Sequence, residues 1–195
     1  MDRNCFFATR RGECEPIRYP LICNNTGNRE RVGGFVDFTY DDSGLTAHFD
    51  CEYEGVIMEP YTKYNDPIYR GDAFELFLSP FGLEERYFEF DTTPHGYNFN
   101  SRIENPTGTL AECELIEEGI VRYTPRISHD RLEMETFVPF SLVLPSGISP
   151  FDIPWLANAY RIDRHGGKGV SFYAASPILI PNFHIPKMFG ELKFK

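Results

Sequence analysis

The sequence predicts a single all-β domain, an antiparallel β-sandwich of the jelly-roll-like kind. Residues 45–54 alternate strictly between apolar and polar side chains, which is typical of a strand with one buried face. About ten more short apolar runs follow the same pattern, separated by turns that draw on 16 glycines and 15 prolines. No amphipathic helix of three turns is present, so helical fold classes are excluded.

The strands are predicted one after another between turn signals. Residues 41–44, 93–96 and 117–119 are short polar connections of the kind that join antiparallel hairpins. Only residues 140–144 are expected to form a single helical turn. The predicted strands cover residues 35–40, 45–54, 73–79, 87–92, 97–102, 111–116, 120–127, 132–138, 155–163, 171–175 and 189–194.

The chain contains no internal repeat and no Ser/Gly linker that would divide it. Residues 8–34 carry turn and loop chemistry rather than a strand or helix pattern. We therefore expect residues 1–34 to form an N-terminal arm packed on the same domain, and residues 35–195 to form the sandwich.

Composition narrows the class of partner. The 195 residues carry a formal charge of −10, which would repel a nucleic acid backbone or an anionic membrane surface and would suit a neutral ligand or a calcium ion. The N-terminus lacks the apolar core of a signal peptide and no run is long enough to span a membrane, which indicates a cytoplasmic protein. The five cysteines are odd in number and irregularly spaced, which favours reduced structural thiols over disulfides or a zinc site.

Three segments, in the same order, resemble those of family 9 carbohydrate-binding modules and their DOMON-like relatives. Residues 67–78 (PIYRGDAFELFL) are similar to an "aromatic, two residues, Asp, two residues, Glu, apolar strand" segment of that family. Residues 155–163 resemble its late strand, and residues 183–194 resemble its closing motif. The resemblance covers residues 35–195 and implies an antiparallel β-sandwich, non-catalytic binding of a mono- or oligosaccharide, and structural metal ions, usually calcium.

The resemblance also assigns candidate ligand-binding residues. Tyr69 takes the place of a tryptophan that stacks on the sugar, Glu75 matches the sugar-binding carboxylate, and Arg102 is the nearest match to the sugar-binding arginine. A ring for the apolar face of a pyranose and charged groups for its hydroxyls are the chemistry that such a site needs. Ala175 stands where the second stacking tryptophan would be, so the two-ring clamp is incomplete there.

Alternation along residues 97–102 adds Asn98 and Asn100 to the strand face that carries Arg102, giving a surface rich in hydrogen-bonding groups. Each candidate has a plainer explanation. The polar strand face could simply be solvated, Tyr69 could pack on the core, and Glu75 could belong to a structural ion pair.

The sequence supports three other functions less strongly: a metal site, a sugar hydrolase and a haem-binding domain. A metal ion could be held around one predicted hairpin by four acidic residues, Asp41, Asp42, Asp50 and Glu52. A polar turn is the favoured interpretation there. A sugar hydrolase would need two carboxyl groups flanking one bond, and Glu75, Glu89 and Asp91 lie on strands that could converge. A haem-binding relative would use a methionine and a histidine, from Met58, Met134, Met188 and His184. No nucleophile-elbow or phosphate-loop motif is present, so we expect no enzyme activity.

Overall fold

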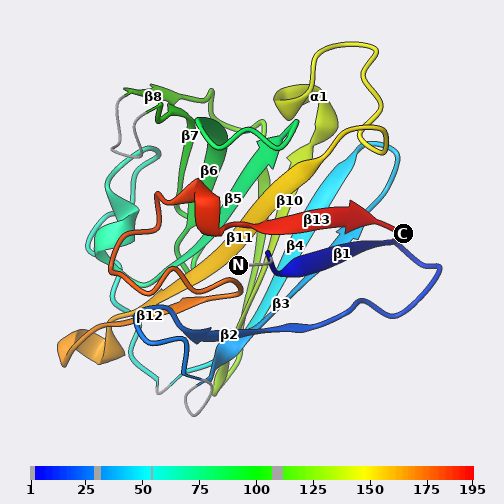
Figure 1. The fold of residues 1–195 in the computed structure, drawn as a ribbon. Helices are drawn as coiled ribbons and strands as arrows, with labels where there is room; N and C mark the ends of the chain where they lie inside the picture. Colours follow the sequence, from blue (N-terminus) through cyan, green and yellow to red (C-terminus); the bar gives the residue numbers. More distant parts are fainter. Residues whose placement is uncertain (1–2, 29–31, 54, 107–111) are drawn as a thin grey trace.

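The structure is a computed structural model, and it describes residues 3–28, 32–53, 55–106 and 112–195. Two layers of strands face each other across one apolar core (Figure 1). The first layer has the order β8 (Glu112–Leu115), β7 (Asn98–Glu104), β6 (Arg86–Thr92), β5 (Ala73–Pro80) and β11 (Trp155–Asp163). The second has the order β3 (Val32–Tyr40), β4 (Gly44–Glu52), β10 (Arg131–Pro139) and β9 (Arg122–Ile127).

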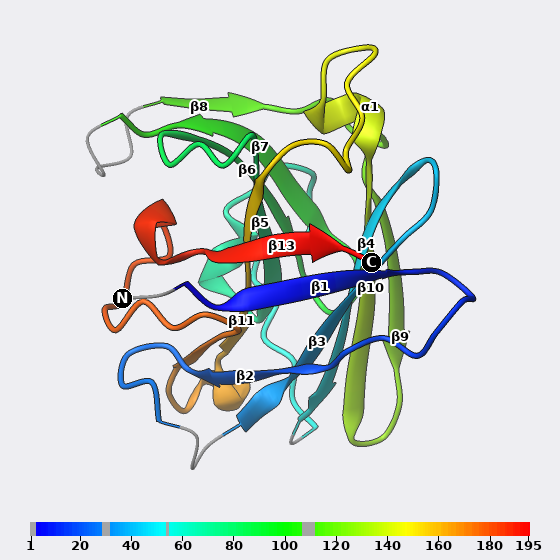
Figure 2. The ribbon, with the colours of Figure 1, turned by 45° about the vertical axis from the view of Figure 1, so that its right-hand side comes forward.

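Two strand pairs join the layers along one side. β12 (Ser171–Ala174) pairs with β11 and β2 (Tyr19–Cys23), while β13 (Gly190–Phe194) pairs with β11 and β1 (Cys5–Arg10). Figure 2 shows β13, β1 and β2 crossing between the two groups of strands. The prediction of a β-sandwich is confirmed, with the refinement that β1 runs parallel to both β13 and β3.

The predicted strands of residues 35–195 are all present, with ends displaced by up to three residues. The single helical turn is α1 (Phe140–Val143). Glu54 and Ala111, at the ends of two predicted strands, lie outside the described residues, as do residues 29–31 of the arm. The arm differs from its expected loop character, because β1 and β2 take part in the sheet. Pro20 and a register irregularity interrupt the alternation of β2, which explains why no strand was predicted there.

Alternation in the first layer separates two apolar clusters. Leu76 and Phe90 belong to the core between the layers. Phe77 and Tyr87, one residue out of phase, belong to a second cluster on the outer face. The segment that leads from β12 to β13 covers this outer face, with Ile178 and Phe189 in the second cluster. No helix among the described residues is long and apolar enough to cross a membrane.

Candidate functional site

A cavity of roughly 500 Å³ opens on the outer face of the first layer, between the sheet and the segment that follows β12. Tyr69 and Glu75 both line it. Tyr69 lies in the 3-10 helix Ile68–Arg70 and its side chain is 40% exposed, whereas Glu75 lies in β5 and is 2% exposed. The structure therefore brings together the ring and the acid that the sequence singled out.

The other three predicted residues lie on the opposite face of the sheet. Directly paired residues of an antiparallel ladder share a face, and Arg102 and Asn100 pair with Phe88 and Phe90 of the core. Asn98 follows the same alternation. Asn98, Asn100 and Arg102 do share one strand face, as expected, but that face is not the one that carries Glu75, so the assignment of Arg102 to the site of Tyr69 and Glu75 is corrected.

The side chains on that opposite face form ion pairs and hydrogen bonds with their neighbours. Arg102 forms an ion pair with Glu114 of β8 at 2.8 Å. Asn100 is buried, donates to Asn98 at 3.1 Å and accepts a hydrogen bond from the Tyr123 hydroxyl. These residues stabilise the edge of the sandwich and do not line the cavity of Tyr69 and Glu75.

Aromatic rings form two sides of the cavity. On one side the Tyr69 ring meets Phe99 of β7 edge to face, with centroids 6.1 Å apart. On another side Phe172 of β12 meets Phe183 edge to face, with centroids 5.7 Å apart. Phe183 is fixed in turn, because its ring stacks on Tyr160 at 4.0 Å.

Ala175, the position that the resemblance gave to a second stacking ring, is buried and belongs to the core. Phe172 lines the cavity three residues earlier. Its register partner in β11 is Ile162, which lines the same cavity. This strand pairing is the signal that would have identified Phe172, but it is not visible in the sequence.

Polar groups complete the lining of the cavity. Arg164 is held at the rim by hydrogen bonds to the carbonyl oxygens of Tyr69 and Gly71, at 3.1 and 3.3 Å. His184 bonds the Tyr87 hydroxyl through Nδ1 at 2.9 Å, and burial lowers the pKa of its imidazole to about 4. Asn182 accepts a hydrogen bond from the His184 amide. Sequence reasoning missed Arg164, Asn182 and His184 as members of this site, because loops bring them there.

The carboxyl groups of Glu75, Glu89 and Asp91 meet at this site. One oxygen of each lies within 4.8 Å of the others, and all three residues are buried. Burial, and then the neighbouring carboxylates, raise the pKa values of Glu75 and Asp91 well above the usual range, and burial raises that of Glu89. The two strands β5 and β6 therefore bring the three carboxyl groups together, as the hydrolase alternative required.

Asp41 and Asp50 of the β3–β4 hairpin have structural partners. Asp41 accepts hydrogen bonds from the Ser43 and Gly44 amides, as a polar turn does. Asp50 pairs with Arg18 and Arg131.

The methionines considered for haem are spread through the fold. Met134 is buried in the core between the layers, whereas His184 lines the outer cavity. These two residues therefore do not face a common space.

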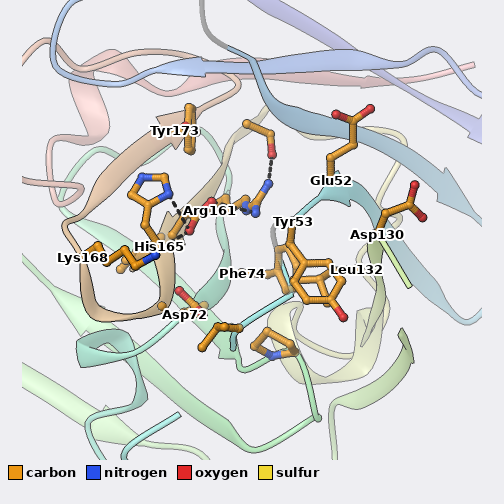
Figure 3. A pocket seen from close by; sticks show the side chains of 17 residues that line it. Glu52, Tyr53, Asp72, Phe74, Asp130, Leu132, Arg161, His165, Lys168 and Tyr173 are labelled. Carbon is orange, nitrogen blue, oxygen red and sulfur yellow. Dashed lines mark hydrogen bonds and ion pairs between the residues drawn. The ribbon is translucent and has the colours of Figure 1, made fainter. Parts of the chain in front are cut away.

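A second cavity, of roughly 530 Å³, lies at one end of the sandwich (Figure 3). Glu52 and Asp130 lie on one side of it and His165 and Lys168 on the other, with Arg161 between them. Arg161 donates to the Gly33 carbonyl and pairs with Asp163 at 3.0 Å. Six charged residues line this cavity, against three in the cavity of Tyr69, so it offers less to the apolar face of a neutral ligand.

The chain has the fold of family 9 carbohydrate-binding modules. Neither a protein-family profile nor a curated protein matches the sequence. The structure resembles that of a protein from Bacteroides uniformis ATCC 8492 proposed to bind carbohydrate, with a TM-score of 0.80, 16% identity and coverage of 98% of this chain and 99% of the other.

It also resembles a family 9 module from Caldicellulosiruptor kristjanssonii, solved in complex with glucose and in complex with cellotriose. Both comparisons give a TM-score of 0.67 and 11% identity over 98% of this chain, and they cover 96% and 94% of the module.

Proposed function

We propose that the protein binds a mono- or oligosaccharide, without transforming it, in the cavity that Tyr69 and Glu75 line. One observation carries the proposal. An exposed ring and a buried carboxyl group, from separate elements, line one cavity in a fold shared with a module solved with glucose and with cellotriose. The cavity volume lies in the usual range for small-molecule sites.

Each wall of the cavity matches one part of a sugar. The half-exposed Tyr69 ring offers a flat surface to the C–H face of a pyranose, and Phe172 offers a second aromatic wall. Glu75 and Arg164 supply an acceptor and a fixed donor for the hydroxyl groups. This division of apolar face and polar rim favours a neutral, polyhydroxylated ligand.

Isothermal titration with glucose, cellobiose and cellotriose tests the proposal. We expect saturable binding that Tyr69→Ala weakens about two- to tenfold, because a lost aromatic contact is worth about 0.5–1.5 kcal/mol. Phe172→Ala should act in the same direction. Tyr97→Ala is the matched control, since Tyr97 is 39% exposed and does not line the cavity. Absence of heat with all three sugars, or equal losses in the Tyr69 and Tyr97 variants, would reject the site.

Hydrolysis of a sugar is the second candidate, because three carboxyl groups meet in the cavity wall. Glycosidases hold their two carboxyl groups about 5–5.5 or 6.5–9.5 Å apart around the scissile bond, and here the closest oxygens lie within 4.8 Å. Burial also raises the pKa of all three carboxyl groups, which disfavours an ionised nucleophile. We therefore expect no turnover in a screen of chromogenic glycosides, and release of the chromophore would support the hydrolase instead.

A further inference from the structure

Three carboxyl groups lie together under the cavity with few groups to balance their charge. Glu75 of β5 and Asp91 of β6 are direct cross-strand partners, and Glu89 lies two residues before Asp91 on the same face. Their exposed fractions are 2%, 0% and 6%. Like charges directly opposite each other destabilise a sheet, and a buried charge is costly unless it is paired.

Asp91 is the least compensated of the three. Neither oxygen of its carboxylate accepts a hydrogen bond from any donor among the described residues, although both are buried. Burial raises its pKa most, and the neighbouring groups that raise the pKa further, Glu89, Glu75 and Cys113, are themselves acidic. A buried acceptor without a donor indicates that something other than the protein faces it.

The surrounding side chains supply little positive charge. Arg164 acts on Glu75, but its guanidinium is held at the rim by two backbone carbonyls. His184 approaches Glu89 only to 4.0 Å, and its imidazole is neutral because it is buried. Ser101 donates one hydrogen bond to Glu89 at 3.2 Å.

We propose that Glu75, Glu89 and Asp91 bind a divalent cation, Ca²⁺ by its coordination chemistry, at the floor of the cavity. Three oxygens that lie within 4.8 Å of one another are at most 4.8/√3, or about 2.8 Å, from a common centre. This limit includes the roughly 2.3–2.6 Å of Ca²⁺ ligands, and Ca²⁺ accepts an irregular set of carboxylate ligands, whereas Mg²⁺ demands near-ideal octahedral geometry.

The open side of the cavity suits such an ion. Ca²⁺ takes about six to eight oxygen ligands, and three carboxylates supply between three and six of them. Glu75 and Glu89 line the cavity, so water or a ligand hydroxyl can reach the remaining positions. The cation site goes beyond the proposed sugar binding and does not depend on it.

Binding of the metal alone tests the proposal. Tyrosine-sensitised luminescence should report Tb³⁺ at the site, since Tyr160 is the cross-strand partner of Glu75, and Ca²⁺ should displace Tb³⁺ with a stoichiometry of one. Asp91→Asn and Glu89→Gln should each weaken Ca²⁺ binding at least tenfold. Glu118→Gln, which removes an exposed carboxylate in the β8–β9 connection, is the control and should leave binding unchanged.

Thermal unfolding provides a second readout that a misfolded variant cannot imitate. In chelator, Asp91→Asn should melt above the wild type, because it removes one of the mutually repelling acids. Ca²⁺ should raise the Tm of the wild type and leave that of the variant unchanged. A wild type that neither binds Tb³⁺ nor responds to Ca²⁺ would overturn the proposal and indicate that shared protons neutralise the cluster. Cation binding retained by Asp91→Asn would also overturn it.

Sugar titrations with and without chelator separate the two proposals. Sugar binding by a protein that binds neither Tb³⁺ nor Ca²⁺ would leave the sugar site intact and reject the cation site. Cation binding without any sugar binding would support the cation site and reject the sugar site.

Discussion

The substitution Asn158→Ala should detach the segment that forms one wall of the cavity. Asn158 is fully buried in β11, and its side-chain amide links the sheet to the segment after β12 through hydrogen bonds. Its Nδ2 donates to the Ser176 carbonyl at 2.7 Å and to the Tyr160 hydroxyl at 2.8 Å. Its Oδ1 accepts from the Ser176 amide at 2.9 Å and from the Ala159 amide at 3.0 Å.

The alanine variant loses these bonds and leaves buried backbone groups of Ser176 without partners. An unsatisfied buried group costs about 1–3 kcal/mol, and Ser176 contributes both a donor and an acceptor. We therefore expect the free energy of unfolding to fall by about 3 kcal/mol. Sugar affinity should fall as well, because Phe183 and His184 belong to the detached wall.

Urea unfolding at equilibrium measures this effect. The midpoint should decrease while the slope of the transition stays constant, since the surface exposed on unfolding changes little. Asn25→Ala, at an exposed turn position, is the control and should change stability by less than about 0.5 kcal/mol. A decrease in the free energy of unfolding below about 1 kcal/mol for Asn158→Ala would refute this role of Asn158, because it would mean that the Ser176 backbone finds other partners.

Two further predictions concern titratable side chains. In the native protein, a chromogenic thiol reagent should modify the exposed Cys14 and Cys113 quickly. Cys51 should react only after unfolding, because it is buried and burial raises the pKa of its thiol to about 11. Rapid reaction of Cys51 in native buffer would contradict its placement in the core. The hydrogen bond to Asp37 raises the pKa of His48 above its ordinary value of 6.5, so the stability that this pair contributes should be complete below pH 6.5 and should be lost as the pH rises through the raised value. Unfolding midpoints of wild type and His48→Ala measured from pH 5.5 upward should therefore converge, and a gap that widens with pH would show that the sign is wrong.

Strands with a clean alternation could be predicted from the sequence, because side-chain period identifies a half-buried strand directly. Residues 45–54 are the clearest case, and β4 pairs on both sides as such a strand should. β2 could not be predicted in this way. Pro20 and the register irregularity at Pro20 and Ile22 disturb its pattern, and its place in the sheet depends on distant partners in β3 and β12.

The candidate site was predicted in part for a comparable reason. Tyr69 and Glu75 are close in sequence, so one local segment fixes both. Arg102 depends on the register between β6 and β7, and a shift of one residue moves a side chain to the other face of a sheet. The observed register places Arg102 opposite Phe88, on the core side. Phe172, Asn182 and His184 come from β12 and the segment after it, whose approach to β5 and β6 no local pattern reveals.

A crystal structure of the protein with cellotriose would test the central claim most directly. We expect one pyranose ring to lie against Tyr69, with its hydroxyl groups toward Glu75 and Arg164, in the cavity on the outer face of the first layer. A sugar bound in the end cavity of Figure 3, or on the β7 face that carries Asn98 and Arg102, would contradict the claim.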